Sequence, residues 1–300
     1  MERAHRSETR IGLRSRRGVR ALTSRLAAAL ALGVAAASLV GCGRNPVDQT
    51  ATTRSAAPAA LRGDLEQARQ RRVLFAHKSV GENVLSGLRA VLAESAIEWK
   101  IANVDQAPPG AVLVEATPGE NGDPRSKVDG FAALVRKASP PPDLALMKLC
   151  YVDVTEDTDV GAVFGHYEQT LRQLEQEFPG IAFGHVTVPL SPPSRTVKDR
   201  VKRWVGRRVW ADASNAKRAE YNARLRAAFP AARIFDLAAI EATRPDGSRE
   251  EVVVNGQPVP ALVPAYASDG DGHLNALGQR VAAEGFVRFV VAATGKTAPR

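Results

Sequence analysis

The sequence is poor in cysteine and in aromatic residues: its 300 residues include two Cys, and Phe, Trp and Tyr together make up 5%. Two cysteines cannot build a disulfide framework, which excludes a small cross-linked secreted scaffold. A long apolar run is also lacking, because the stretch Leu26–Val40 has 15 residues and membrane-spanning helices need roughly 18–20. Hydrophobic residues nevertheless amount to 44%, enough for a sizeable core and too many for a disordered chain.

The net charge of +9 is concentrated at the N-terminus. Residues 1–41 hold eight Arg, no Lys and two Glu, a net charge of +6, and the other residues carry only +3. Outside this segment no basic run is interleaved with aromatic residues in the way that could follow a phosphate backbone. We therefore expect no nucleic-acid binding.

The N-terminal segment has the pattern of a secretory leader. A basic region, Arg3–Arg20, precedes an Ala/Leu/Val stretch, 21–40, which ends in Leu39-Val40-Gly41-Cys42. This ending resembles a bacterial lipoprotein signal, and the length of the apolar run disfavours the alternative, a transmembrane anchor. The resemblance implies a signal peptide over 1–41 and diacylation of Cys42, so that the protein contacts the membrane through this lipid.

The remaining chain divides into a tether and a domain. Residues 42–65 are rich in Ala, Thr, Ser, Pro and Arg without periodicity, which is typical of a flexible linker, and 66–300 are expected to fold. The lipid anchor implies a location in the cell envelope, facing the periplasm or the exterior. Gly43 after the cysteine slightly favours the outer membrane.

The folded part alternates short apolar runs with segments of helical period. The predicted strands are 73–76, 97–102, 143–149, 181–188 and 233–235, and the predicted helices begin near residues 81, 128, 167, 213 and 276. A Gly/Pro-rich loop is expected over 106–124, and Asn255-Gly256 predicts a hairpin turn. Parallel strands need crossover connections, so this order predicts one three-layer α/β domain with helices on both faces of a parallel sheet.

In such sheets the working site lies beyond the carboxyl ends of the strands, where two segments carry chemistry. Ser79 follows the first strand at the start of a helix, where the helix amides could also stabilise an oxyanion. The alternative role for Ser79 is an ordinary helix N-cap. His273 lies in an acidic, glycine-containing loop with Asp271 and Asp269, either of which could orient its ring.

The alternatives for this acidic loop are calcium binding and a simple turn. A calcium-binding EF-hand loop starting at Asp269 would need Gly at its sixth position and Glu at its twelfth, where the chain has Leu274 and Arg280. No metal site is expected, because no close His/Asp/Cys spacing supports one.

Five sequence runs resemble a divergent branch of the SGNH/GDSL hydrolase superfamily, and the likeness covers about Arg72 to Val291. The resemblance implies a flavodoxin-like sheet, with Ser79 as nucleophile, His273 as base and Asp271 or Asp269 as the orienting acid. The runs are FAHKSVGEN at 75–83, NGDP at 121–124, MKLCYVD at 147–153, VPL at 188–190 and DGHLN at 271–275.

The resemblance leaves the oxyanion donors open. The superfamily's Gly-x-Asn-Asp is replaced by Cys150-Tyr151-Val152-Asp153, which lacks the donor Asn. Losing such a donor typically costs ~10²–10³ in rate. The candidate donors are the Ser79 amide together with Gly119, Asn121, Gly122 and, more weakly, Asn83. The loop residues could instead be plain turn residues, and His77 could line the pocket or pack against the neighbouring strand.

The other notable residues are expected to be structural. His185 is interpreted as a core residue, His166 as helix surface and Cys150 as a small buried hydrophobe. A basic cluster lies between residues 198 and 208 near Trp204 and Trp210. It could contact anionic polysaccharide, nucleic acid or lipid headgroups, but a solvated lid is favoured, because charge runs usually form solvated faces.

The sequence thus favours a serine esterase or acyl hydrolase that needs no cofactor. Its substrate is expected to be a small-molecule ester or an O-acylated carbohydrate. Two alternatives remain open, a non-catalytic binding lipoprotein on the same scaffold and an O-acyltransferase.

Overall fold

The structure is a computed structural model that describes residues 59–268 and 271–295. The predicted signal peptide, Cys42, most of the tether and Asp269 lie outside the described residues. Where the tether is described, the prediction is wrong: residues 59–65 belong to helix α1 (Ala59–Ala68), with Leu61 and Leu65 buried in the core. The folded domain therefore begins before residue 66.

Six parallel strands form the central sheet, in the order β2-β3-β1-β4-β5-β6. When the edge strand β2 is left out and the other five strands are numbered 1 to 5 along the chain, their order in the sheet is 2-1-3-4-5. This is the flavodoxin-like arrangement, so the predicted fold class is confirmed. The strands are β1 (Val73–Ala76), β2 (Ile101–Asn103), β3 (Leu113–Ala116), β4 (Leu144–Met147), β5 (Ala182–Val186) and β6 (Ile234–Phe235).

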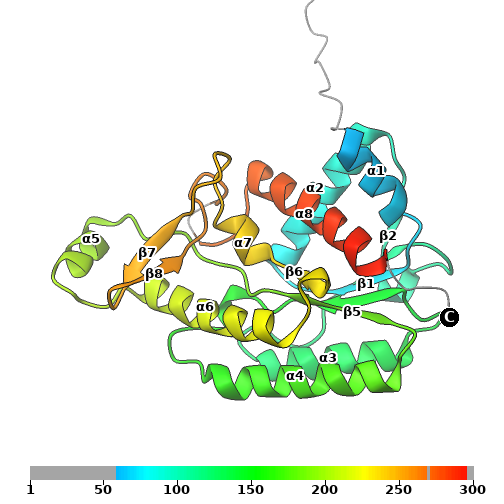
Figure 1. The fold of residues 1–300 in the computed structure, drawn as a ribbon, viewed down its shortest axis with the longest axis horizontal. Helices are drawn as coiled ribbons and strands as arrows, with labels where there is room; N and C mark the ends of the chain where they lie inside the picture. The colour runs from blue at the N-terminus through cyan, green and yellow to red at the C-terminus, as the bar shows by residue number, and fades with distance from the viewer. Residues whose placement is uncertain (1–58, 269–270, 296–300) are drawn as a thin grey trace, which may run out of the picture. The chain divides into compact units, whose positions relative to one another are not determined.

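The strands are apolar on both faces because helices cover the sheet on both sides. In β1, Val73 and Phe75 join one core cluster, and Leu74 and Ala76 join the other. Figure 1 shows α1, α2, α7 and α8 over one face and α3, α4 and α6 over the other. The helices are α2 (Val80–Ser95), α3 (Pro124–Lys137), α4 (Val160–Glu177), α5 (Val197–Trp204), α6 (Trp210–Ala228), α7 (Leu237–Glu241) and α8 (Ala276–Thr294).

Two differences from the predicted sheet concern the side that ends in β2. The loop predicted over 106–124 contains the unpredicted strand β3, and the strand predicted at 97–102 is β2, at Ile101–Asn103. Strand β3 has only four residues and lies between Gly110 and Pro118. The turn-forming residues around it made the sequence look like a loop, although the strand itself is mostly apolar. Its pairing with β1, from Val73↔Leu113 to Ala76↔Ala116, supplies the order that the local sequence does not.

Asn255-Gly256 forms the predicted hairpin turn between β7 (Glu251–Val254) and β8 (Gln257–Pro260). Asn255 has φ 51° and Gly256 φ 77°, the left-handed conformations that such a turn requires. Within residues 59–268 and 271–295, no helix has the length and apolar character to cross a membrane.

Candidate active site

The site lies where the strand order changes direction, at the carboxyl end of β1. The register pairs Ala76 at the end of β1 with Ala116 of β3 and Met147 of β4. The loops after these three strands therefore leave the same edge side by side, and three residues later they reach Ser79, Gly119 and Cys150. A crevice at such a point is the usual ligand site of open α/β sheets.

Ser79, His273 and Asp271 form a continuous hydrogen-bonded chain. Ser79 Oγ lies 2.6 Å from His273 Nε2, although the two residues are 194 positions apart in the sequence. On the other side of the imidazole, His273 Nδ1 lies 2.6 Å from Asp271 Oδ2. The chain places an alcohol, a base and a carboxylate in the order that nucleophilic catalysis requires.

Asp271 holds both the ring and the backbone of His273. Its Oδ1 accepts a 2.8 Å hydrogen bond from the His273 amide while Oδ2 contacts the ring. Burial works to raise the pKa of Asp271, but the hydrogen bonds from the amide and ring of His273 outweigh it and hold the pKa below its usual value. Asp271 thus stays a carboxylate that can stabilise an imidazolium.

The backbone of Ser79 adopts an unusual conformation, with φ 53° and ψ −112°. Ser79 occupies the N-cap position of α2, but its side chain makes no capping hydrogen bond and points to His273 instead. The alternative of an ordinary N-cap serine is therefore wrong. A strained residue at the end of a strand, with its side chain on a base, is typical of a functional position.

The predicted oxyanion residue Asn83 instead holds the His273 loop. Asn83 Oδ1 accepts a 3.0 Å hydrogen bond from the amide of Leu274, the residue after His273. This contact joins the first turn of α2, which begins beside Ser79, to the segment that carries the imidazole. Asn83 is thus a positioning residue in this structure.

A buried ion pair organises the loop after β3. Lys127 Nζ lies 2.5 Å from Asp153 Oδ2, and both side chains are buried. The same carboxylate accepts the Gly122 amide at 2.8 Å and the Cys150 amide at 2.6 Å. Asp153 therefore ties the loop after β3 to the 3-10 helix η2 (Tyr151–Asp153) that follows β4.

These contacts decide between the predicted oxyanion donors. The Gly122 amide already donates to Asp153, so the prediction that it serves an oxyanion is wrong. Asn121 Oδ1 accepts from Lys127 Nζ at 2.8 Å, which fixes the amide group while its Nδ2 donates to none of the described residues. The amides of Ser79 and Gly119 likewise donate to none of the described residues, and Gly119 has φ 65°.

Tyr151, which the sequence did not single out as functional, contacts the imidazole, and Arg218 supports Tyr151 from behind. The ring of Tyr151 meets that of His273 edge-on, with 5.8 Å between their centroids. The buried Arg218 of α6 lies over the Tyr151 ring at 5.6 Å and donates to the backbone oxygens of Tyr151 and Val154. The signals missed were the polar stripe Asn215, Arg218 and Asn222 on the buried face of α6 and the Tyr that follows β4.

Arg218 also anchors the loop after β5. Its guanidinium donates to Ser191 Oγ at 2.8 Å, and the Asn215 side chain bonds both the amide and the carbonyl of Ser191. Burial lowers the pKa of Arg218 to about 10, which leaves it charged at neutral pH. One helix thus positions two of the loops around the site.

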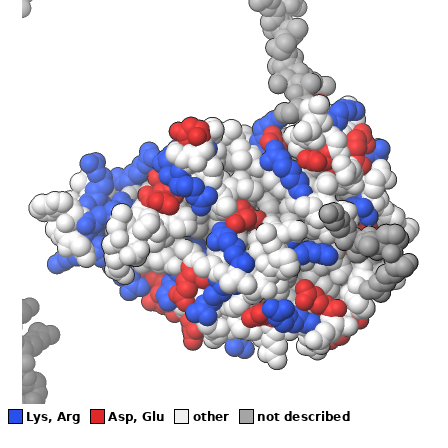
Figure 2. Space-filling view, in the orientation of Figure 1, with Lys and Arg blue, Asp and Glu red and all other residues white. Residues whose placement is uncertain are grey.

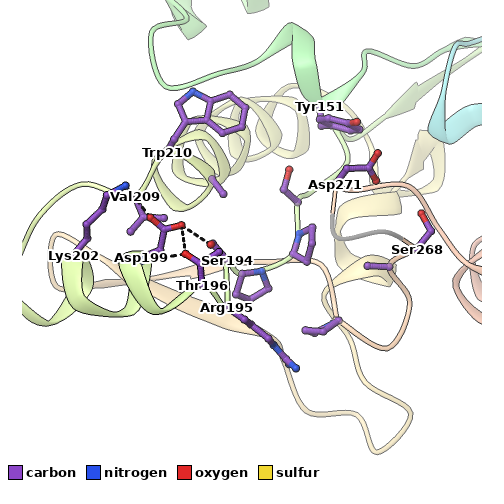
Figure 3. Close-up of a pocket in the computed structure, with 16 residues that line it drawn as sticks. Tyr151, Ser194, Arg195, Thr196, Asp199, Lys202, Val209, Trp210, Ser268 and Asp271 are labelled. Atoms are coloured by element: carbon purple, nitrogen blue, oxygen red, sulfur yellow. Dashed lines mark hydrogen bonds and ion pairs between the residues drawn. The ribbon is translucent and has the colours of Figure 1, made fainter. Parts of the chain in front are cut away.

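A pocket of about 880 Å³ opens beside Asp271 and Tyr151 (Figure 3). Its walls come from the loop after β5, the start of α6 and the segment before His273, and Ser79 and His273 lie next to it without lining it. Figure 3 shows Ser194, Thr196 and Asp199 hydrogen-bonded together on the side away from Asp271. The pocket therefore lies on the Asp271 side of the hydrogen-bonded chain from Ser79 through His273.

His77 does not line the site, contrary to one of its predicted roles. Its side chain is 3% exposed, packs against the Phe75 ring and lies 3.7 Å from Glu115. Burial, with smaller contributions from Lys148 and Arg89, lowers the pKa of His77 to about 3, so the ring is neutral.

His77 belongs to the one group of described residues that could hold a metal. Ligand atoms of His77, Glu82 and Glu115 lie within 4.8 Å of one another. Arg89 lies 2.6 Å from Glu82 and 3.6 Å from Glu115, so a guanidinium already supplies positive charge to this group.

The other two described histidines, His166 and His185, and Cys150 lie where they were predicted, at the helix surface and in the core. His185 is buried, stacks on Phe229 and bonds the Tyr167 hydroxyl at 2.9 Å, whereas His166 pairs with Asp129 at the helix surface. Cys150 is fully buried, with its sulfur 3.4 Å from Lys148 Nζ.

Comparisons with known proteins give distant structural likenesses. No protein-family model matches the sequence, and no curated protein is significantly similar to it. A protein described as a platelet activating factor from Streptococcus pneumonia is 15% identical with a TM-score of 0.40, covering 70% of this chain and 92% of its own. A protein described as a lipolytic protein of the G-D-S-L family from Desulfitobacterium hafniense is 12% identical with a TM-score of 0.38, and the match covers 72% of this chain and 98% of that protein.

A salicylyl-acyltransferase from a tetracycline biosynthetic pathway is 14% identical with a TM-score of 0.36, covering 72% of this chain and 53% of its own.

Proposed function

We propose that the protein is a serine-dependent acyl hydrolase of the SGNH type, acting on a carboxylic ester. The single observation that carries the proposal is the hydrogen-bonded chain from Ser79 Oγ through the His273 ring to Asp271, with 2.6 Å at each step. A serine hydroxyl is a weak nucleophile until a base within this distance takes its proton. A purely structural serine at a helix start would cap the helix, which Ser79 does not do.

In the proposed reaction Ser79 Oγ attacks the ester carbonyl and His273 Nε2 accepts its proton. The tetrahedral intermediate collapses as His273 returns this proton to the departing alkoxide, leaving an acyl group on Ser79 and a free alcohol. Water, deprotonated by His273, then releases the carboxylic acid and restores the serine. Asp271 keeps the imidazole in the required tautomer and stabilises the imidazolium.

The proposed oxyanion donors are the amides of Ser79 and Gly119 and the side-chain Nδ2 of Asn121. What supports them is that none of the three donates to another described residue, and that Lys127 and Asp153 fix the loop carrying Asn121. Pre-oriented donors stabilise developing negative charge without reorganisation, which is the largest single effect in many acyl transfers.

The pocket beside Asp271 favours a substrate larger than a simple acetate ester, and an O-acylated carbohydrate is the candidate that the sequence suggested. Transfer of the acyl group to a sugar hydroxyl is the second candidate function, because the same acyl-enzyme serves both reactions. We further propose that a lipid on Cys42 holds the enzyme at the cell envelope. Processing at Gly41-Cys42 and fatty-acid labelling lost in Cys42→Ala would test this placement.

A fluorophosphonate probe tests the proposed function directly. Wild-type protein is expected to be labelled at Ser79, and labelling should vanish in Ser79→Ala and fall strongly in His273→Ala. The matched control is Ser86→Ala on α2, whose hydroxyl bonds Glu82 alone among the described residues and which should be labelled like wild type. A folded wild-type protein that leaves the probe unreacted would favour the binding lipoprotein without catalysis.

Hydrolysis of aryl esters with acyl chains of increasing length then tests turnover. Removing a member of a Ser-His-Asp unit typically lowers kcat by roughly 10⁴ or more, so Ser79→Ala should approach the uncatalysed rate. Undiminished hydrolysis by Ser79→Ala would refute the assignment of the nucleophile. Addition of sugar acceptors separates transfer from hydrolysis, since a transferase would form acyl-sugar at the expense of free acid.

A further inference from the structure

Helix α5 turns its apolar face to solvent. Val197, Val201, Trp204 and Val205 follow the i, i+4, i+7, i+8 spacing of one helix face. They are 75%, 52%, 87% and 49% exposed, although side chains of this kind are usually buried. An ordinary surface helix has the opposite orientation, with its apolar face on the core.

The polar face of α5 holds the helix against the domain. Arg203 donates two hydrogen bonds to Asp212 of α6, at 2.6 and 2.8 Å, and a third to the Ser194 carbonyl. Asp199 accepts from the hydroxyls of Ser194 and Thr196. These contacts fix the inverted orientation, because rolling the apolar face inward would break them.

Basic residues border the exposed apolar face. Lys198 and Arg200 lie on either side of the stripe in helical projection, and Arg207 follows the helix; none of the three forms an ion pair with a described residue. Residues 194–208 contain seven Lys or Arg and a single acidic residue, Asp199. Figure 2 shows basic side chains gathered at the end of the domain where Figure 1 places α5.

Neither a lid nor a dimer contact fits the apolar stripe on α5 well. A lid over the pocket would need its apolar face toward that pocket, but the α5 residues that line the pocket are Asp199 and Lys202, on the opposite face. A second copy of the chain packed on the stripe would bring two sets of unpaired basic residues together, which is unfavourable.

We propose that α5 is a membrane-contact helix that binds an anionic lipid bilayer. Trp204 and the three valines would enter the boundary between headgroups and acyl chains, and the flanking basic residues would contact lipid phosphates. The inference depends neither on the lipid predicted at Cys42 nor on the chemistry of Ser79. Binding through α5 would give the domain a second contact with the membrane and so fix its orientation there. The pocket beside Asp271 would then face a defined direction, because its far end is lined by Thr196 and Lys202 of the same segment.

The test uses the full chain and a readout local to Trp204, so that the N-terminal segment cannot produce the signal. Tryptophan emission is measured with vesicles of phosphatidylethanolamine and phosphatidylglycerol, with and without lipids brominated in the acyl chain, and with phosphatidylcholine vesicles. The difference between wild type and Trp204→Phe isolates Trp204 from Trp99 and Trp210. We expect a blue shift and bromine quenching of Trp204 in the anionic vesicles only.

Charge reversal tests the basic border. The double variant K198E/R200E should lose the Trp204 quenching, because each basic residue near an anionic surface strengthens partitioning by roughly five-fold. The matched control is K100E/K137E, which makes the same charge change at two exposed positions away from α5. Circular dichroism confirms that each variant is folded.

An unquenched Trp204 in anionic vesicles, with probe labelling of Ser79 intact, would overturn the membrane proposal while leaving the proposed hydrolase untouched. Equal quenching by neutral vesicles, or an equal loss in K100E/K137E, would overturn the role of the basic border. Concentration-dependent dimers that disappear in Trp204→Glu would assign the stripe to a second copy instead.

Discussion

The ring of Tyr151 meets the ring of His273 edge-on, with 5.8 Å between the centroids. Asp271 holds the imidazole through Nδ1, Ser79 contacts Nε2, and Tyr151 of η2 packs against the ring at a near right angle. Arg218 in turn covers the Tyr151 ring from α6. The imidazole is therefore positioned by elements from three separate parts of the chain.

Tyr151→Ala should slow Ser79 acylation by roughly 10–100-fold, because misplacing a reacting group by about 1 Å costs this much. Tyr151→Phe keeps the ring and should stay close to wild type. Single-turnover kinetics with an aryl ester measure the acylation rate. Equal losses in the two variants would mean that the hydroxyl, and not the ring, is what His273 needs.

Asp271→Asn should lower kcat by up to about 10⁴, because the amide favours the wrong imidazole tautomer. Asp269, the other carboxylate that the sequence offered, lies outside the described residues, and Asp269→Asn is the natural comparison. Steady-state ester hydrolysis by the two variants shows which carboxylate orients His273. A larger loss in Asp269→Asn would transfer the orienting role to that residue.

Lys127→Met should destabilise the fold by roughly 3–5 kcal/mol, because it leaves the Asp153 carboxylate buried without its cation. The double variant K127M/D153N removes both charges and should recover part of this loss. Urea unfolding of the two single variants and the double variant gives the coupling energy. Full additivity would show that the ion pair is not what holds the loop carrying Asn121.

Glu241 should make the fold progressively less stable as the pH rises from about 4.5 to about 8. Burial raises its pKa to about 8, against the opposing effects of the Leu190 amide, Lys148 and Arg218. The folded state thus keeps a proton that the unfolded state has already released. From about pH 4.5, the ordinary value, to about pH 8, unfolding is favoured by at most about 1.4 kcal/mol per pH unit.

Glu241→Gln removes this titration while keeping an acceptor for the Leu190 amide, which Glu241 Oε2 bonds at 2.7 Å. The variant should match wild type near pH 4 and become increasingly more stable than wild type up to pH 8. Unfolding curves at a series of pH values measure this difference. A constant difference across the range would contradict the raised pKa.

The sequence predicted the layered α/β fold because the apolar runs and helical periods of this chain are regular along most of its length. It missed β3 and placed β2 too early, because both are short strands on one side of the sheet whose order comes from pairing with neighbours. The sequence also extended the predicted tether to residue 65, into helix α1. The Ala-rich start of α1 shows no clear alternation of apolar and polar residues, and only the packing reveals that Leu61 and Leu65 are buried.

Site residues next to strand ends could be selected from the sequence, and the structure brings Ser79, His273 and Asp271 together. The supporting network could not be selected, because its members are distant in sequence. Lys127 and Asp153 look like surface charges until both prove buried, and Asn83 contacts a loop 191 positions away. Gly122 was misassigned because only the fold shows that its amide already has an acceptor.

The positive φ of Ser79 favours glycine at this position, whereas the proposed reaction needs a serine hydroxyl there. A conformation of this kind costs a non-glycine residue roughly 1–3 kcal/mol, and glycine adopts it freely. A Ser79→Gly variant would therefore be more stable to unfolding, but His273 would lose the hydroxyl that it contacts. The serine found there therefore lowers the free energy of unfolding, a cost that its proposed role as nucleophile would explain.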